Sequence, residues 1–162
     1  MKHLIYTVGL FIALAMASCA TTPAEYAEQA ALEIEKVETQ NNLIVESLSK
    51  HDIAGAEAAL KEAKAQAEKS LEKLNKMKDY EGNDAVRQSC IEYVDFYKTI
   101  FNNEYEQAFE ILRKEKRTTD DVNRLSEILM SVTNENNFVK ADFVKALKKF
   151  CKEYELTISK KE

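Results

Sequence analysis

Most of the residues that could carry acid, base or metal chemistry are carboxylates: the chain has 28 Asp and Glu, two His and three Cys. A di-iron site in a helical bundle needs a Glu-x-x-His pair from each of two helices. The histidines are His3, near an apolar N-terminal stretch, and His51, in a polar break, so that pattern is absent. The sequence also has no Cys-x-x-Cys pair, Gly-rich phosphate loop or Gly-x-Ser-x-Gly motif. We therefore predict no metal, no other cofactor and no catalytic triad.

A group of carboxylates between residues 92 and 110 could be read as an acid-base site. Its members are Glu92, Asp95, Glu104, Glu106 and Glu110. Solvated helix faces produce such sets routinely, and no residue beside them would shift a pKa or complete a metal site. We interpret them as a solvated face and predict that the protein is not an enzyme.

Cys90 and Cys151 could form a disulfide in an oxidising compartment. Cys90 lies about 25 residues before the expected turn between the last two helices, and Cys151 about 32 residues after it. At about 1.5 Å per residue the axial mismatch is on the order of 10 Å. This mismatch exceeds the usual Cα separation of a disulfide, so two separate buried thiols are expected.

The third cysteine, Cys19, follows an apolar run from Leu4 to Ala17, and Lys2 gives that run a positive start. The residues Met16-Ala17-Ser18-Cys19 resemble the lipobox of bacterial lipoprotein signal peptides, in which an aliphatic residue and two small residues precede the cysteine. Met16 stands where that family usually has Leu, Val or Ile.

The resemblance implies thioether diacylation of Cys19, removal of residues 1–18 as a signal peptide, and N-acylation of the new terminus. Residues 19–22 would then be the lipidated cysteine and a short tether to the membrane. By analogy with lipoprotein sorting, Ala20 and the lack of an acidic run after it favour the periplasmic face of the outer membrane, with surface exposure as the alternative.

The N-terminal stretch has two other interpretations. Ala15-Met16-Ala17 is an A-x-A site at which ordinary signal peptidase would release a soluble periplasmic protein. An uncleaved membrane helix is disfavoured, because about 14 apolar residues fall short of the roughly 20 that span a bilayer.

Composition restricts the rest of the chain. The 23 Lys and Arg against 28 Asp and Glu give a net charge of −5, and there is no basic stripe, so nucleic-acid binding is disfavoured. With three Gly, one Pro and no Trp in 162 residues, the chain has little of the turn chemistry of a sheet protein. Its abundant Ala, Glu, Lys and Leu favour long helices in one domain of residues 23–158.

Capping and turn residues divide this domain into four expected helices. The dividing signals are a capping box at Thr22-Pro23-Ala24-Glu25, a cap at Asp52, a turn at Gly82 and a cap at Thr118. The helices expected between them are about 23–48, 53–77, 84–114 and 119–154.

Apolar residues in the expected helices recur at alternating spacings of three and four, so each helix should bury one stripe. In the last helix this stripe includes Val122 and Leu129. The second stripe is rich in alanine, which makes the second helix the close partner of the first. Residues 133–137 are weak helix formers and predict a bend without a break. Short connections predict an antiparallel up-down-up-down four-helix bundle after an N-terminal signal helix, with a three-helix arrangement and an overhanging last helix as the alternative.

Polar and aromatic residues mark two features inside the expected bundle. Asn41 and Asn136 occupy apolar-stripe positions, and we interpret them as register-setting residues satisfied by a neighbour or water instead of ligand contacts. Four aromatic residues of the third helix recur every fourth position. We interpret them as core, with a groove for a small apolar ligand or partner helix as the alternative. They are Tyr97, Phe101, Tyr105 and Phe109.

The end of the last helix is basic, whereas the start of the first helix is rich in glutamate. In the expected bundle these two ends meet beside the lipid anchor. Mutual screening of exposed charges is the ordinary interpretation; the sharper hypothesis is that the lysines face anionic lipid head groups. The lysines concerned are Lys145, Lys148, Lys149 and Lys152.

Three further segments are a D-x-x-x-A pattern at Asp52, the run E-Y-V-D-F-Y-K at residues 92–98, and F-x-x-A-L-K-K-F-C-K-E-Y at residues 143–154. Together they resemble a group of uncharacterised helical bacterial surface or envelope lipoproteins over most of residues 40–156, a resemblance that implies no activity. The sequence therefore leaves two hypotheses for the function. The protein is a lipid-anchored, non-catalytic module that binds an envelope protein, or it is a carrier or sensor of a small apolar ligand.

Overall fold

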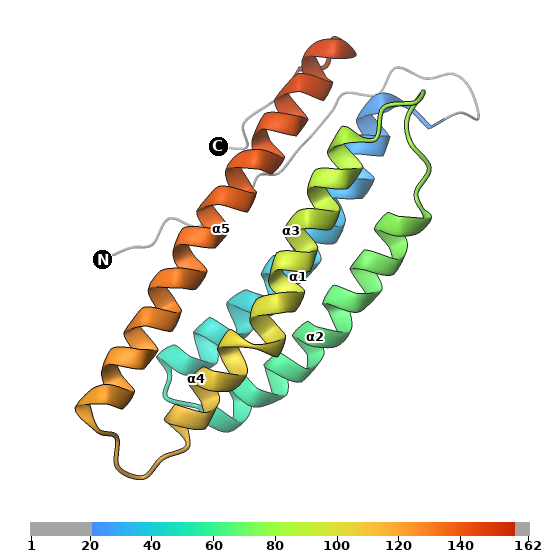
Figure 1. The fold of residues 1–162 in the computed structure, drawn as a ribbon. Helices are drawn as coiled ribbons and strands as arrows, with labels where there is room; N and C mark the ends of the chain where they lie inside the picture. The colour runs from blue at the N-terminus through green and yellow to red at the C-terminus, as the bar shows by residue number, and fades with distance from the viewer. Residues whose placement is uncertain (1–20, 158–162) are drawn as a thin grey trace.

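The computed structural model describes residues 21–157, which form five helices and no strand (Figure 1). The all-α prediction is therefore confirmed for these residues. None of the five helices is both long and apolar enough to cross a bilayer. The predicted signal peptide and Cys19 lie outside the described residues. The helices are α1 (Pro23–Ser49), α2 (Ile53–Lys76), α3 (Ala85–Asn102), α4 (Glu104–Leu112) and α5 (Thr119–Glu153).

Three of the helices begin where a side chain can satisfy a free backbone N–H group. Glu25 N donates to Thr22 Oγ1 at 3.2 Å, and Thr22 N donates to Glu25 Oε2 at 2.8 Å, which completes the predicted capping box. Thr118 caps α5 in the same reciprocal way, and Asp52 accepts the N–H of Gly55 at the start of α2. The predicted starts of α1, α2 and α5 are thus confirmed.

The helix predicted over residues 84–114 is not continuous. Asn103, whose backbone is distorted to φ −117° and ψ −70°, belongs to neither helix and separates α3 from α4. The side-chain amide of the preceding Asn102 donates to the carbonyl of Lys98 at 2.8 Å. Asparagine favours helix ends because its side chain competes for backbone hydrogen bonds, and two in succession account for the interruption.

α1 and α2 form the closest helix pair, and α3 packs against both (Figure 1). Alanines on the facing surfaces are fully buried, among them Ala30 of α1 and Ala63 and Ala67 of α2. Small side chains let two helix backbones approach closely. The prediction that the alanine-rich helix is the close partner of the first is confirmed.

The first half of α5 is more exposed than its apolar pattern predicts. Val122 and Leu129 are 52% and 57% exposed, whereas Phe143 and Phe150 in the second half are buried. α5 packs on α3 and α4 and approaches α1 closely at few points, so no helix of residues 21–157 covers one flank of its first half. The predicted burial of Val122 and Leu129 is therefore wrong. The helix itself runs unbroken through residues 133–137.

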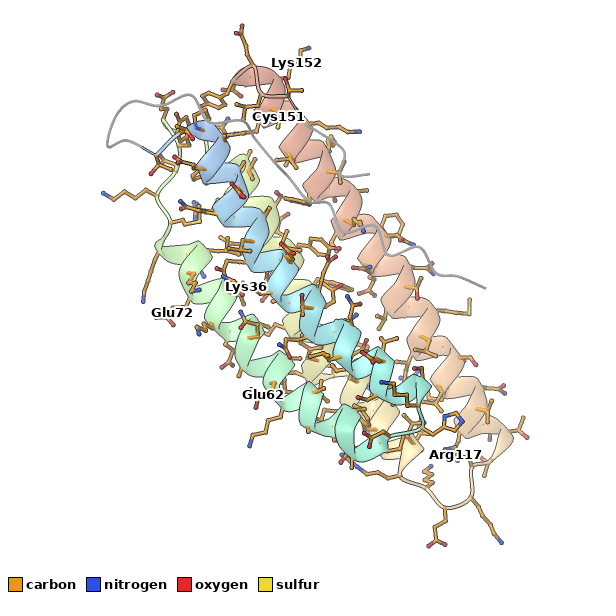
Figure 2. The ribbon with its side chains drawn as sticks, turned by 180° about the vertical axis from the view of Figure 1, so that it is seen from behind. Lys36, Glu62, Glu72, Arg117, Cys151 and Lys152 are labelled. Atoms are coloured by element: carbon orange, nitrogen blue, oxygen red, sulfur yellow. The ribbon has the colours of Figure 1, made fainter. Side chains whose placement is uncertain are left out.

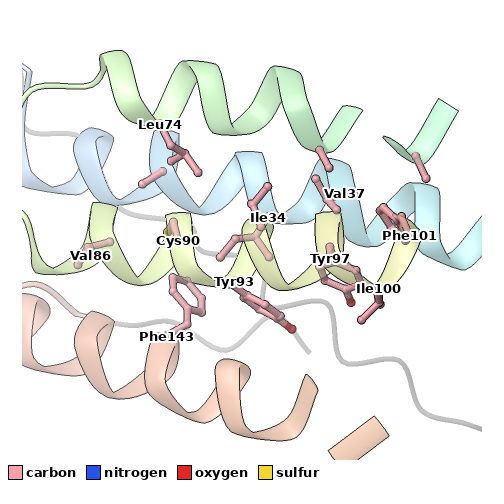
Figure 3. Close-up of a cluster of buried hydrophobic side chains, with 14 of the residues drawn as sticks. Ile34, Val37, Leu74, Val86, Cys90, Tyr93, Tyr97, Ile100, Phe101 and Phe143 are labelled. Carbon is pink, nitrogen blue, oxygen red and sulfur yellow. The ribbon is translucent and has the colours of Figure 1, made fainter. Parts of the chain in front are cut away.

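Side chains from all five helices share one core, which Figure 3 shows around α3. Tyr93 of α3 faces Phe143 of α5, with ring centroids 6.2 Å apart. Cys90 and Cys151 are both buried and both free thiols, as the axial mismatch predicts. Burial raises the pKa of each thiol, so neither is poised as a thiolate nucleophile.

Four aromatic rings close one end of the helices. Tyr26 at the start of α1 lies 5.7 Å from Phe150 near the end of α5, measured between ring centroids. Tyr80, from the turn between α2 and α3, packs on Tyr26, Phe150 and Tyr154. That turn contains Gly82 in the predicted left-handed conformation, with φ +83°. The start of α1 and the end of α5 are therefore neighbours.

Candidate binding groove

A pocket of about 200 Å³ lies between α1, α3, α4 and α5. Val45 of α1 and Leu129 of α5 stand at its rim and are 51% and 57% exposed, so the pocket is open to solvent there. We name this pocket the α1–α5 groove. Among the described residues, no charged side chain lines it. The lining residues are Asn41, Val45, Phe96, Tyr97, Ile100, Tyr105, Leu129, Val132, Thr133 and Asn136.

On the α1 side, cross-helix hydrogen bonds hold polar side chains in place. The Tyr105 hydroxyl donates to Asn41 Oδ1 at 2.7 Å, and the Tyr93 hydroxyl donates to Glu38 Oε1 at 2.8 Å. Glu38 and Asn41 are three residues apart and so share one face of α1. These two bonds tie α1 to α3 and α4 beside the groove, and they show that Asn41 is satisfied by a neighbour.

The tyrosines of this region remain protonated at neutral pH. Burial, with smaller contributions from Tyr97 and Glu38, raises the pKa of Tyr93 far above its ordinary value. Burial also raises the pKa of Tyr97, and it raises the pKa of Tyr105 to about 12. Their hydroxyl groups therefore act as neutral hydrogen-bond donors.

On the α5 side, the groove is lined by Asn136, whose side-chain oxygen lacks a hydrogen-bond donor among the described residues. Its Oδ1 atom is enclosed and has no hydrogen-bond partner among the described residues. The neighbouring Thr133 differs, because its hydroxyl donates to the carbonyl of Leu129 at 2.7 Å. Buried polar atoms are normally paired; among residues 21–157, Asn41 Oδ1 has a partner and Asn136 Oδ1 has none.

All four residues of the predicted aromatic face are buried, but only two of them line the groove. Tyr97 and Tyr105 line the groove, whereas Phe101 and Phe109 do not and are about 0% and 1% exposed. Tyr97, Phe101 and Tyr105 form a continuous row, with successive ring centroids 5.6 and 5.8 Å apart. The sequence did not predict that α1 and α5 residues line a groove. Apolar periodicity identifies the apolar face of a helix, but it does not show whether another helix packs against that face.

The predicted basic residues of α5 are all exposed. They recur at spacings of three and four, so they lie on one side of the helix. Figure 2 shows Lys152 at the tip of α5, next to Cys151. Because Tyr26 and Phe150 are in contact, this basic stretch lies near the glutamate-rich start of α1. Its members are Lys145, Lys148, Lys149 and Lys152.

Sequence analysis missed a buried polar cluster between α1 and α2. Glu33 is 5% exposed; it accepts hydrogen bonds from Ser70 at 2.8 Å and from Lys36 at 2.6 Å, and Lys73 lies 3.3 Å away. Burial alone would raise the pKa of Glu33, but these donors outweigh it and lower the pKa. The sequence spacing could have predicted that Ser70 is buried, because it falls in the same three-four series as the buried Ala63, Ala67 and Leu74.

The carboxylates of residues 92–110 do not converge on one site. Glu92, Asp95 and Glu110 are exposed, and Glu106 pairs with Lys64 of α2 at 2.5 Å. Across residues 21–157, no group of three or more His, Cys, Asp or Glu side chains could hold a metal ion.

Comparisons of the chain with family models, with curated proteins and with solved structures find no match in any of the three.

Proposed function

We propose that this protein is a lipid-anchored, non-catalytic binding module of the bacterial envelope. The lipobox-like residues Met16 to Cys19 support the anchor, and α1 begins within a few residues of that cysteine. Three residues of extended chain reach about 10 Å, so acylation of Cys19 would hold the domain close to the membrane. The periplasmic face of the outer membrane is the proposed location.

We propose an up-down-up-down bundle in which α3 and α4 together form the third helix. Its support is the short connections, the α1–α2 and α3–α5 packing, and the contact between the start of α1 and the end of α5. In this arrangement the end cluster of Tyr26, Tyr80, Phe150 and Tyr154 faces the membrane anchor.

The observation that carries the binding function is the α1–α5 groove with its exposed apolar rim. Val45 and Leu129 flank the groove, and Val122, two turns before Leu129 on the same side of α5, is 52% exposed. Exposed apolar side chains gathered near a groove are typical of an interaction surface. The first candidate occupant is a protein component of the envelope.

The partner hypothesis is tested by photo-crosslinking in native membranes. A benzophenone amino acid at Leu129 should give a discrete crosslinked species, whereas the same group at Glu62, exposed on α2 (Figure 2), should not. Equal crosslinking from both positions would contradict a specific binding face.

The lipid anchor is tested separately by mass spectrometry of the mature N-terminus, which should carry acyl chains on Cys19. An unmodified N-terminus at Ser18 would indicate cleavage by ordinary signal peptidase.

The second candidate function is that of a carrier or sensor of a small apolar ligand. Tyr97 and Tyr105 from the aromatic row, together with Phe96, give the groove an aromatic wall, which specifically favours this candidate. Calorimetric titration of small apolar compounds against the full chain distinguishes it from the first, because a carrier binds without any envelope protein present.

The basic stretch of α5 is proposed to orient the domain on anionic head groups. Lys145, Lys148, Lys149 and Lys152 share one exposed side, and basic residues near an anionic surface contribute about 1 kcal/mol each. Glu28, near the start of α1, and Glu153, at the end of α5, are exposed carboxylates at the same end, and their negative charge weakens this attraction. Binding to anionic vesicles should fall with salt and with a Lys148→Gln, Lys152→Gln double substitution; salt-independent binding would contradict the proposal.

A further inference from the structure

One side of α1 carries a row of carboxylates. Glu28, Glu35 and Glu38 recur at spacings of seven and three residues, so they lie along the same side of the helix. Val45, seven residues after Glu38, continues this row and lines the α1–α5 groove. The row is therefore acidic near the start of α1 and apolar at the groove.

The side of α5 that borders the groove is apolar in its first half and basic in its second half. Leu129 and Thr133 line the groove, and Val122, seven residues before Leu129, is 52% exposed. Lys140 follows Thr133 by seven residues, and Lys148 lies about two turns further along. We name this row and the row on α1 together the α1–α5 flank.

The two rows carry opposite charges at matching levels. Counting along both helices from the aromatic contact that joins the start of α1 to the end of α5, Glu28 is level with Lys148, and Glu35 is level with Lys140. Within residues 21–157, no ion pair joins α1 to α5, and none of these four side chains forms one with another helix. Their charges are therefore free to pair with a second molecule.

The pattern of the α1–α5 flank is self-complementary. A two-fold axis parallel to the helices places α1 of one copy over α5 of the other at the same level. Glu35 of each copy then faces Lys140 of the other copy, and Val45 of each lies near Leu129 of the other. A two-fold axis across the helices would instead lay α1 on α1, with acidic row against acidic row. Charge matching, which sets the orientation of an interface more than its affinity, therefore selects the parallel axis.

We propose that the protein partner of the α1–α5 flank is a second copy of this chain, bound in a parallel dimer whose two-fold axis runs along the helices. This inference rests on the first proposed function, the binding of an envelope protein, and names that partner. The starts of both α1 helices lie at the same end of such a dimer, so both lipid anchors reach one membrane. Each copy contributes few large apolar side chains, and we therefore expect a reversible dimer.

Charge exchange between chains tests this dimer. Glu35→Lys and Lys140→Glu should each weaken self-association about tenfold or more, because each variant sets like charges against each other twice across the two-fold axis. An equal mixture of the two variants should recover the affinity of the unmodified chain, since every facing pair in the mixed dimer is again opposite in charge. Pairing within one chain cannot produce this recovery. Sedimentation velocity of the acylated protein measures the association over a concentration series, in a neutral detergent kept in excess over protein.

The matched controls make the same charge changes on α2. Glu62→Lys and Lys69→Glu alter exposed positions outside the α1–α5 flank (Figure 2 labels Glu62) and should leave self-association unchanged. Helical circular dichroism of all four variants should equal that of the unmodified chain, which shows that a loss of association is not a loss of folding.

Three results would overturn the inference: an unmodified chain that stays monomeric throughout the series, flank variants that associate as well as the unmodified chain, or a mixture that associates no better than its components. Photo-crosslinking from Leu129 separates the dimer from the function on which it rests. Purified protein alone should give a product of twice the chain's mass. A discrete product of another mass, formed only in native membranes, would support the binding of a different envelope protein and exclude the dimer. No discrete product in either sample would contradict both.

Discussion

Glu33 illustrates how a single charged residue can be stabilising inside a helix interface. Its carboxylate is enclosed between α1 and α2, but Ser70, Lys36 and Lys73 supply hydrogen-bond donors or positive charge. Ser70 is fully buried and also accepts a hydrogen bond from Gln66 at 2.9 Å. The cluster therefore replaces the water that Glu33 loses on folding, which is the condition for burying a carboxylate without a large penalty.

We predict that Glu33→Gln lowers the free energy of unfolding by about 1–2 kcal/mol at pH 7, because charge-assisted hydrogen bonds become neutral ones. The pKa of Glu33 is lower in the folded state than its ordinary value of 4.5. The ionised group therefore stabilises the folded state above that ordinary value, and this contribution is lost as the pH falls through the lower folded-state pKa. Urea unfolding at a series of pH values should show the difference between the two proteins shrinking progressively below pH 4.5.

Glu46→Gln is the matched control, since Glu46 pairs with Lys50 at 2.6 Å on an exposed surface. It should leave the free energy of unfolding unchanged within error. A difference between Glu33→Gln and the parent chain that persists undiminished at low pH would show that the lost stability is not electrostatic.

The two stripe asparagines, treated alike by the sequence pattern, should respond differently to substitution. Asn41→Leu leaves the hydroxyl of Tyr105, a residue only 7% exposed, without its acceptor, and should cost about 1–3 kcal/mol. Adding Tyr105→Phe should recover most of that loss, because both hydrogen-bonding partners are then removed. A double-mutant cycle measured by thermal unfolding tests this; additive losses would mean that the two side chains are not coupled. Asn136→Leu, which removes an unpaired acceptor, should be neutral or stabilising.

At the scale of elements, the sequence predicts helix starts well and helix neighbours less well. Capping is a local property, so Thr22, Asp52 and Thr118 identify the starts of three helices. The break at Asn103 was missed because the apolar spacing of residues 97–109 continues straight through it. Burial of Leu129 was predicted wrongly because a three-four pattern specifies a face but not whether another helix covers it. The groove depends on that missing cover, so its position could not be read from periodicity.

The turn between α2 and α3 depends on Gly82, and we predict that Gly82→Ala destabilises the protein by about 1 kcal/mol. The residue has φ +83°, a region that residues with a Cβ atom enter at a cost. A Cβ atom added there would meet nothing within 4 Å, so the expected loss comes from the backbone and not from a clash. Gly82→Asn should cost less, because asparagine tolerates the left-handed region. Thermal unfolding of both variants checks this; equal losses would point to another cause.

For the whole molecule, stability should be divided unevenly between the well-packed helices and the first half of α5. α1, α2 and α3 pack on one another, whereas α5 packs on α3 and α4 and meets α1 through Tyr26 and Phe150 near one end. Phe143 and Leu147 are buried in the second half of α5, but residues 122–138 leave Leu129, Met130 and Phe138 largely exposed. Regions with few buried apolar contacts open locally at lower free energy than the core.

We therefore predict that backbone amides of residues 122–138 exchange with deuterium well before those in the buried stripes of α1 and α2. Leu129→Ala should leave the global free energy of unfolding nearly unchanged, whereas Phe143→Ala, at a site 6% exposed, should cost about 3 kcal/mol or more. Under the carrier function, a small apolar ligand at saturation should slow exchange specifically in residues 122–138 and near Asn41, because residues of both α1 and α5 line the groove. Equal protection along all of α5 without ligand would show that its exposed first half is held as firmly as the core, and would remove the opening through which a ligand is expected to enter.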